Sequence, residues 1–287
     1  MSEEHSYRSI DIPDNAPFGL EPSPINGWGA FATRRIDRGS LILSEQPLCN
    51  IPLPTAWLSG RLLAQTFARL PPRHQEQLLS LHSPGSFTTV MEVFGQNSFI
   101  SASQDAATGT EQYTCILYIL HSRFNHSCVP NIRAEFGNNM GGLQNFALRD
   151  IAVGEELVCS YYGTIYPGSF RHEREERLHF DCDCPACRPG TLFYELSEMR
   201  RTLIRGLCYL LYGRDIYAQE DAQEDAQEER DTPPIILDQT LRTAAENHSI
   251  PVPNRLVYVF LVAILLEEEG LPVDYIIEAI LSHIIDS

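Results

Sequence analysis

The stretch that decides the fold reads RFNHSCVPN, residues 123–131. It places an amide, an imidazole, a thiol and a proline-locked turn within nine residues, beside apolar segments that read as strands. Packing of a protein core rarely requires so many polar groups together, because each buried polar group needs a hydrogen-bond partner. We therefore interpret the stretch as a loop that binds a ligand or a metal ion.

The sequence on both sides of this loop shows strands and turns. Residues 18–48 are short apolar stretches broken by Gly27, Gly29 and Gly39, which is typical of small strands joined by tight turns. Residues 131–136 and 143–151 predict a hairpin, with the glycine-rich segment 137–142 as its turn. A phosphate-binding loop is the alternative for that segment, but neither a Lys-Ser/Thr pair nor a following helix supports it.

Apolar residues recur at helical spacing in several places. One region runs from about Trp57 to Leu81, and a short apolar helix is predicted from Gln112 to Ser122. After Pro189 the spacing predicts a long helix over residues 192–210.

The C-terminal part continues in the same helical pattern. Residues 219–229 are charged, repeat Gln-Glu-Asp-Ala and predict a solvated linker. Two further helices are expected over residues 255–269 and 272–285. Residues 190–287 are therefore predicted to be a helical region that packs on the main domain.

Composition limits the class of protein. Hydrophobic residues make up 43% of the chain, which is sufficient for a core, and the net charge is -17. That charge argues against binding to a nucleic-acid backbone and is compatible with a basic protein partner, or simply with solubility. The first residues lack an apolar signal segment, and the longest apolar run, 256–266, is too short for a membrane span. We expect an intracellular protein of the nucleus, the cytoplasm or both.

Cysteines point to a metal site. Cys182, Cys184 and Cys187 lie within six residues, and thiolates at this spacing can share one tetrahedral zinc ion. Cys128 is the natural fourth ligand, which would close a structural site. Three unrelated thiols are the alternative, and disulfides are the poorer one without a secretory signal.

Two further motifs are weak by themselves. GWGAF at residues 27–31 would let the backbone approach a ligand closely, although most such glycine pairs are ordinary turns. GEELVCSYYG at residues 154–163 is a turn and a strand that ends in tyrosines. A tyrosine at a strand end is more often a core residue than a catalyst.

Together, these four motifs resemble the SET-domain family in order and spacing over about residues 18–187. The chain is most similar to SMYD-type (SET and MYND) members and to fungal SET proteins without a MYND finger. The fungal group is included because residues 49–95 lack the paired cysteines and histidines of a MYND finger. Gln96-Asn97-Ser98-Phe99 resembles a short segment of SMYD-type members. Leu178 replaces an aromatic residue that these members often have.

The resemblance implies an α+β fold. It would comprise several small β-sheets, an active site with a knotted loop, a helical insert, a zinc-binding post-SET segment and a C-terminal helical appendage. The expected division is an N-terminal arm at 1–17, a SET domain at 18–176 with its insert at about 51–95, a post-SET zinc segment at 177–189 and a helical region at 190–287 with an acidic linker at 218–232.

The resemblance also implies a reaction, in which S-adenosylmethionine donates a methyl group to an amine, usually a protein lysine. Tyr161 would be catalytic, because the family register selects it over Tyr162, and its hydroxyl would orient the amine. The cofactor would contact the Gly27-Trp28-Gly29 backbone, Asn97, Asn125, the main chain of His126, and Phe180, with Tyr161 lining the pore. Zinc would be held by Cys128, Cys182, Cys184 and Cys187.

Two other functions remain open from the sequence. A non-catalytic SET module could use the acidic surface and the C-terminal helices as a scaffold for a basic protein. Methyl transfer to an unusual acceptor is the third hypothesis. The expected partner in the leading hypothesis is a basic protein, a histone or another lysine-containing protein, with no direct nucleic acid and no membrane.

Overall fold

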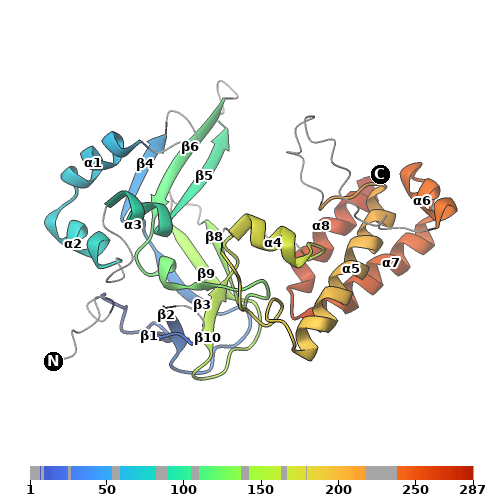
Figure 1. Ribbon diagram of the computed structural model, residues 1–287, viewed down its shortest axis with the longest axis horizontal. Coiled ribbons are helices and arrows are strands. Elements are labelled where there is room, and N and C mark those ends of the chain that lie inside the picture. The colour runs from blue at the N-terminus through green and yellow to red at the C-terminus, as the bar shows by residue number, and fades with distance from the viewer. Residues whose placement is uncertain are drawn as a thin grey trace. The chain divides into compact units, whose positions relative to one another are not determined.

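The structure, a computed structural model, divides into two compact units (Figure 1). Unit 1 comprises residues 1–125 and 131–159, and unit 2 comprises residues 126–130 and 160–287. The structure describes residues 7, 10–24, 27–53, 59–81, 90–104, 110–136, 142–162, 167–178, 180–217 and 238–286. The chain therefore changes units twice within the predicted ligand-binding loop, after residues 125 and 130, and once more after residue 159.

The first sheet of unit 1 carries most of the quoted motifs. Its strand order is β1-β2-β10-β7. These strands are β1 (Phe18–Pro22), β2 (Trp28–Ala32), β10 (Glu156–Cys159) and β7 (Asn125–His126). Leu157 pairs with Ala30 in the antiparallel β10–β2 ladder, and both side chains are fully buried. This pairing brings the motif at residues 27–31 beside the one at residues 154–163.

The second sheet contains the predicted hairpin. Its order is β3-β9-β8, and the strands are β3 (Leu41–Glu45), β9 (Leu143–Ala147) and β8 (Ile132–Phe136). The antiparallel pairing of β8 with β9 confirms the hairpin, and most of its predicted turn lies outside the described residues. The second strand is shorter than expected, because beyond Ala147 only Ile151 pairs, in an isolated bridge to Ile36.

The third sheet shows that one helix prediction was wrong. Residues 112–122, expected to form a helix, instead contribute β6 (Glu111–Leu117), the central strand between β4 (Cys49–Leu53) and β5 (Ser98–Gln104). A short apolar run suits a buried strand as well as a helix. Here Thr114 and Ile116 favour the strand, since they are β-branched, and pairing on both edges fixes it.

Two helices in unit 1, α1 (Gly60–Arg69) and α2 (Pro72–Ser80), confirm the helical region predicted from about Trp57 to Leu81, and a third, α3 (Val90–Asn97), follows that region. Ser59 caps α1 by accepting a hydrogen bond from the backbone of Leu62, and Pro72 occupies the first turn of α2. Figure 1 shows α3 beside the β4-β6-β5 sheet. A single-turn 3-10 helix at His121–Arg123 leads into the ligand-binding loop.

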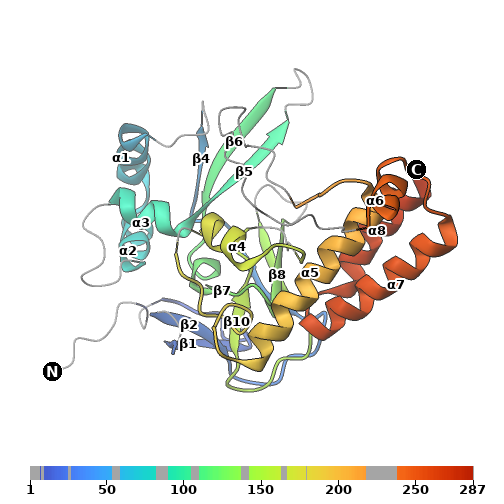
Figure 2. The ribbon, with the colours of Figure 1, turned by 45° about the vertical axis from the view of Figure 1, so that its right-hand side comes forward.

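Unit 2 is helical and confirms the predicted C-terminal helices. It contains α4 (Arg171–Leu178), α5 (Leu192–Tyr212), α6 (Gln239–Glu246), α7 (Val252–Glu269) and α8 (Val273–Asp286). The sequence predicted α5, α7 and α8 but missed the two eight-residue helices, α4 and α6. Helix α7 packs against both α5 and α8 (Figure 2). The predicted linker at 219–229 lies outside the described residues.

Charged residues lie inside the helical bundle of unit 2. Glu269 at the end of α7 is fully buried and pairs with Arg201 at 2.8 Å and Arg200 at 2.7 Å, both from α5. Pairing of this kind satisfies a carboxylate that would be costly to bury alone. Among the described residues, no helix is long and apolar enough to cross a membrane.

Candidate functional site

Asn125 is held firmly within unit 1. Its Nδ2 atom donates to Oε1 of Glu156 at 2.7 Å and to the carbonyl of Trp28 at 3.2 Å, and the other carboxylate oxygen of Glu156 accepts from Ser23 at 2.9 Å. Glu156 is on β10, which lies between β2 and β7 in the sheet. The structure brings Trp28 and Asn125, two of the predicted cofactor residues, into direct contact.

The 27–31 motif requires glycine at two positions, and the structural requirement differs between Gly27 and Gly29. Gly27 has φ +57°, which favours glycine, and among the described residues no atom lies within 4 Å of the point where a Cβ would stand. At Gly29 a Cβ would collide with Oε1 of Glu156 and lie 2.9 Å from Nδ2 of Asn125. The predicted close approach at Gly29 is therefore made by these two side chains, whereas Gly27 leaves room for a ligand.

Asn97 is also buried in unit 1, and its side-chain amide is used within the protein. Its Nδ2 atom donates to the carbonyl of Val93 at 2.7 Å, and its Oδ1 atom accepts from the guanidinium of Arg123. That guanidinium also lies over the ring of Tyr7, 4.4 Å from the centroid. Asn97 and Arg123 together link α3 to the start of the 123–131 stretch.

A partly buried carboxylate fixes the backbone just before this stretch. Glu45 on β3 accepts hydrogen bonds from the backbone N–H groups of Ile119, Leu120 and His121 at 2.8–2.9 Å. Burial raises the pKa of Glu45, and these three hydrogen bonds oppose the shift. Glu45 therefore holds the turn from which Asn125 follows.

Asn131, at the other end of the stretch, holds strand β10. Its Nδ2 atom donates to the carbonyl of Glu156 and its Oδ1 atom accepts from the N–H of Val158, both at 2.8 Å. The side chain is 1% exposed. The two asparagines of the 123–131 stretch therefore tie it to the same strand from unit 1.

Unit 2 contains the other half of the predicted site residues. His126 accepts a hydrogen bond at Nδ1 from the backbone N–H of Tyr161 at 3.1 Å, and its Nε2 atom lies 3.3 Å from the sulfur of Cys128. Burial lowers the pKa of His126 to about 4, so the ring is neutral at pH 7. With Nδ1 as acceptor, Nε2 carries the proton and donates to the sulfur. One imidazole thus connects Tyr161 to a cysteine of the metal cluster.

Aromatic rings surround this imidazole. The rings of Tyr161 and Phe180 lie 5.3 and 6.2 Å from that of His126, and 6.4 Å from each other. Tyr161 is 44% exposed and Phe180 41%, so both offer accessible ring surface. Tyr162 differs from its neighbour, since its hydroxyl donates to the carbonyl of Arg174 inside unit 2.

The four predicted metal ligands come together in unit 2. The sulfur atoms of Cys128, Cys182, Cys184 and Cys187 lie within 4.8 Å of one another, and all four residues are buried. The Cys128 sulfur is 4.0 Å from that of Cys182 and 3.6 Å from that of Cys187. A tetrahedral zinc–thiolate centre requires sulfur atoms about 3.8 Å apart. The cluster therefore has the chemistry and spacing of a four-coordinate metal site. None of the eight cysteines forms a disulfide, so the four thiols are available to bind a metal ion.

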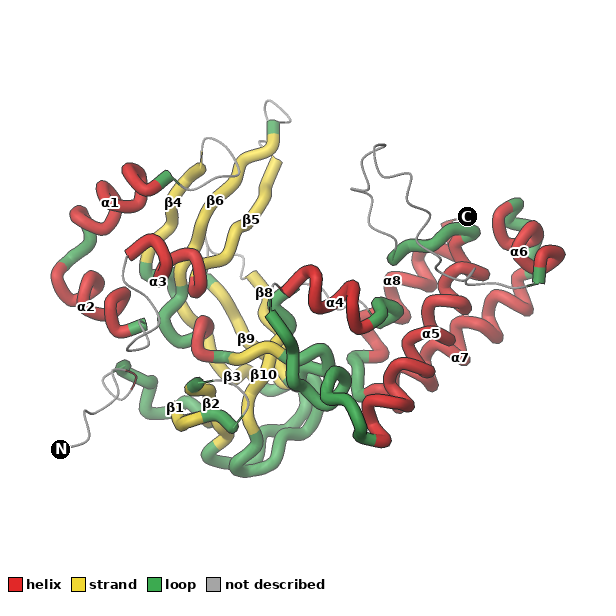
Figure 3. The backbone as a smooth tube through the Cα atoms, viewed as in Figure 1, coloured by secondary structure: helices red, strands yellow, loops and turns green. Residues whose placement is uncertain are grey.

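Leu178, which departs from the family pattern, packs against this cluster. It is 9% exposed and forms one apolar group with the cysteines, Val129, Tyr162 and Phe193. The segment between α4 and α5 that carries three of the ligands is loop throughout its described residues (Figure 3). The cysteine cluster is therefore the main organising feature of this segment.

Sequence reasoning missed the charged residues that support the site. Glu45 and Arg174 have no sequence signal of their own, because Arg174 lies in the segment RHEREER, which reads as a solvated helix face. Glu156 was part of a quoted motif, but its contact with Asn125 depends on strand pairing. Only a signal that reports contacts between distant residues would have identified them.

Comparisons with known proteins agree with this arrangement. The SET domain family matches residues 27–162. The protein-lysine N-trimethyltransferase SMYD5 of Mus musculus is 41% identical over 90 residues, covering 29% of this chain and 21% of that protein. The histone-lysine N-methyltransferase set5 of Schizosaccharomyces pombe is 26% identical over 186 residues, covering 64% of this chain and 54% of that protein.

A third relative is a SET and MYND domain-containing protein of Dictyostelium discoideum. It is 35% identical over 85 residues, covering 29% of this chain and 16% of that protein. The chain thus spans between 16% and 54% of the length of these relatives. The family match covers both motifs of the first sheet and the 123–131 stretch between them. Residues 27–162 of this chain are therefore a SET domain.

Proposed function

We propose that this protein is an S-adenosylmethionine-dependent methyltransferase that transfers a methyl group to the ε-amine of a protein lysine. The observation that carries the proposal is the surroundings of Tyr161. Its backbone is fixed by His126, while its ring is 44% exposed beside Phe180. A half-exposed tyrosine on a fixed backbone, within a SET domain, suits a catalyst better than a core residue.

S-adenosylmethionine, when bound, supplies a methyl group on a positively charged sulfur. The open space at Gly27 and the exposed ring of Phe180 fit such a cofactor, because one leaves room beside the backbone and the other offers a stacking surface. The residues that would hold it are Gly27, Trp28, Gly29, Asn97, Asn125, His126, Tyr161 and Phe180.

The chain's own residues would act by positioning. Transfer to lysine requires a neutral amine in line with the methyl–sulfur bond, so orientation and exclusion of water dominate the rate. The hydroxyl of Tyr161 would accept or donate a hydrogen bond to orient that amine. His126 would keep Tyr161 in place through the backbone N–H, and Glu156 would keep Asn125 in place through its amide.

The cysteine cluster would hold a structural zinc ion. Four thiolates leave no open coordination position, so the metal would stabilise the fold of the post-SET segment and would not take part in the reaction. Cys128 connects this centre to His126 and thereby to Tyr161. Metal binding and the placement of the catalytic tyrosine would therefore be coupled.

The substrate we propose is a basic protein, such as a histone. The net charge of -17 favours association with a basic chain over a nucleic-acid backbone. Two of the three named relatives are a protein-lysine and a histone-lysine methyltransferase, which supports a protein acceptor. Such substrates lie in the nucleus and the cytoplasm, where we expect the protein to act.

Two adjacent tyrosines offer a matched test. Tyr161→Phe should lower methyl transfer to a basic protein extract at least about 100-fold, because a positioned hydrogen-bonding group is lost. It should change the dissociation constant for S-adenosylmethionine, measured by calorimetry, by less than about twofold. Tyr162→Phe removes the same atom from a half-buried residue whose hydroxyl donates to the carbonyl of Arg174, so this variant should retain most methyl transfer and lose thermal stability.

Two results would count against the proposal. Full methyl transfer by Tyr161→Phe would remove this residue from the mechanism. Absence of S-adenosylmethionine binding to the zinc-loaded wild-type protein would instead favour a non-catalytic scaffold.

A further inference from the structure

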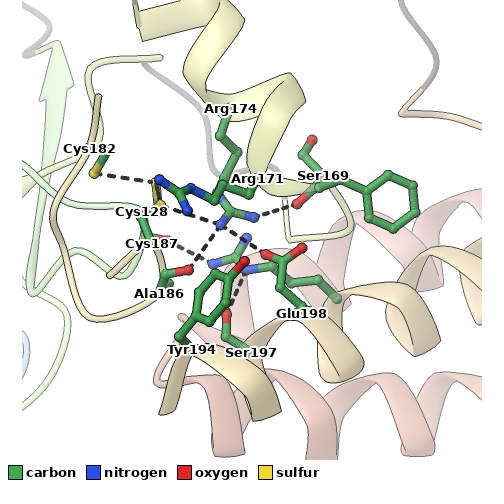
Figure 4. Close-up of polar contacts among 12 residues, drawn as sticks. Cys128, Ser169, Arg171, Arg174, Cys182, Ala186, Cys187, Tyr194, Ser197 and Glu198 are labelled. Atoms are coloured by element: carbon green, nitrogen blue, oxygen red, sulfur yellow. Dashed lines mark hydrogen bonds and ion pairs between the residues drawn. The ribbon is translucent and has the colours of Figure 1, made fainter. Parts of the chain in front are cut away.

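Arg174 on α4 is a buried cation beside the cysteine cluster (Figure 4). Its side chain is only 2% exposed. Nη2 donates to the sulfur of Cys187 at 3.4 Å and to the carbonyl of Ala186 at 3.1 Å, while Nη1 donates to the carbonyl of Ser169 at 2.6 Å. Arg174 is therefore placed by several contacts, one of which is a metal-ligand sulfur.

Burial of a guanidinium is costly unless a negative charge compensates it. Glu198 on α5 lies 3.2 Å from Nη2, but its side chain is 28% exposed and therefore partly screened by water. The carbonyls of Ser169 and Ala186 are neutral. The sulfur cluster is the other anionic group, since four thiolates around one divalent zinc ion carry a net charge of about -2.

The buried charge of Arg174 lies directly beside a predicted metal ligand, because Nη2 donates to the sulfur of Cys187 at 3.4 Å. A thiolate is the form of cysteine that binds metal. A cation that donates a hydrogen bond to such a sulfur stabilises its negative charge.

We propose that Arg174 is a positioning residue of the metal centre, and that its hydrogen bond to Cys187 and its buried charge set how tightly the four cysteines hold the metal. The inference rests on the proposed zinc site and adds a supporting residue to it. Donors to ligand atoms usually change metal affinity about 10- to 100-fold when removed.

Helix α5 belongs to the same arrangement. Glu198 reaches Arg174, and one turn later Arg201, which is 1% exposed, donates to the carbonyl of Cys128 at 3.0 Å. The helix thus contacts both ligand-bearing segments, one through Arg174 and one through the Cys128 backbone. Helix α5 is therefore part of the support of the metal centre as well as of the helical bundle.

The test compares Arg174→Gln and Arg174→Lys with Arg171→Gln. Arg171 lies one turn earlier on α4 and pairs with Glu175 at 2.6 Å, so the control removes the same charge from the same helix without touching a sulfur. Zinc affinity is measured by competition with a chelator. The sulfur-to-metal charge-transfer band is recorded with cobalt, because this band reports hydrogen bonding to the thiolates and is insensitive to global stability.

We expect Arg174→Gln to bind zinc at least tenfold more weakly and to shift the cobalt band to lower energy, with Arg174→Lys between it and wild type. Arg171→Gln should match wild type in both. Wild-type affinity and an unshifted band in Arg174→Gln would overturn the inference while leaving the zinc site intact. A wild-type protein that binds no zinc would instead overturn the zinc site itself.

If Arg174→Gln does not fold, the crystal structure of the zinc-loaded wild-type protein decides. A distance from Nη2 of Arg174 to the sulfur of Cys187 below about 3.6 Å supports the inference, since N–H···S hydrogen bonds have that length. A distance beyond about 4.0 Å, the limit for a hydrogen bond to sulfur, would overturn it.

Discussion

Each unit holds a charged side chain against a segment that carries predicted site residues, but the charges and the degree of burial differ: Glu45 in unit 1 is partly buried and Arg174 in unit 2 is buried. In unit 1, Glu45 is a carboxylate that accepts three backbone N–H groups ahead of Asn125. In unit 2, Arg174 is a guanidinium that donates to two carbonyls and to the sulfur of Cys187. The hydrogen bonds of Glu45 come from the backbone, whereas Arg174 also donates to a sulfur whose charge and partners would change with metal binding.

This difference leads us to distinguish two regions. Paired strands hold the site residues of unit 1 in place, whereas the site residues of unit 2 would be held by the bound metal. Asn125 and Gly29 lie on paired strands above a large apolar core. Tyr161, Phe180 and the cysteines lie in irregular segments around a small sulfur cluster. We therefore expect the unit 1 residues to be ordered without metal and the unit 2 residues to require it.

Cys184→Ser should have the largest effect, and it should disturb the metal-dependent region of unit 2 while leaving unit 1 ordered. The change removes one of four metal ligands, so zinc content should fall, and affinity for S-adenosylmethionine should fall with it, by at least about tenfold. Hydrogen exchange should speed up in residues 180–188 and stay slow in the β4-β6-β5 sheet. Metal analysis, calorimetry and exchange mass spectrometry measure these three effects.

Cys208→Ser is the matched control. Cys208 is a buried thiol on α5 in the same unit, and its sulfur lies 3.7 Å from the hydroxyl of Tyr217. This variant should keep its zinc and its cofactor affinity. Equal loss of exchange protection in both units after Cys184→Ser would show that the metal supports the whole protein, against the comparison.

Glu45→Ala should have the next largest effect, confined to unit 1. It leaves three backbone N–H groups without their acceptor and should lower the free energy of unfolding by about 3 kcal/mol. Glu45→Gln retains one acceptor oxygen and should lose less. Urea unfolding gives both values, and zinc content should stay at the wild-type level in both variants. Loss of zinc in Glu45→Ala would contradict the separate support of the two regions.

Gly29→Ala should have the smallest effect and sharpens the account of unit 1. The added Cβ collides with Glu156 and should break its hydrogen bond to Asn125, at a cost of about 1–2 kcal/mol. In a Glu156→Ala background the same change should cost less, because the nearer of the two obstacles is gone and only Nδ2 of Asn125, at 2.9 Å, remains.

Gly27→Ala provides the contrast for this pair of measurements. Its cost of about 1 kcal/mol comes from the positive φ and should be the same in the wild-type and the Glu156→Ala backgrounds. A Gly29→Ala cost that does not depend on the side chain at position 156 would refute the steric explanation.

The sequence predicted the family motifs and most of the regular elements, for reasons visible in particular residues. The cysteine spacing and the helical repeats of α5, α7 and α8 are local patterns, and the structure confirms the cluster and the helices. Strand β6 was predicted as a helix because its apolar run is short, and periodicity does not distinguish a helix from a strand in such a run. The pairing of β6 with β4 and β5, which makes it a strand, is a long-range contact.

Long-range contacts could not be read from local patterns. Glu45 meets the turn at residues 119–121, and Arg174 meets both Cys187 and Glu198, through folding of distant segments. The predicted cofactor roles of Asn97 and Asn125 stay predictions, and the structure adds that both amides already hydrogen-bond inside unit 1. Folded-state partners of this kind depend on geometry that residue type alone does not specify.

The pairing of early with late segments has a consequence for how the chain is made on the ribosome. Strand β2 cannot pair with β10 until β10 has been synthesised. Likewise, Cys128 cannot share a metal ion with Cys187 until Cys187 has been synthesised. Folds dominated by such distant contacts form slowly and leave strand edges uncovered meanwhile. The nascent protein should therefore depend on chaperones and on the cellular zinc supply late in translation, and shortage of either should lower its yield.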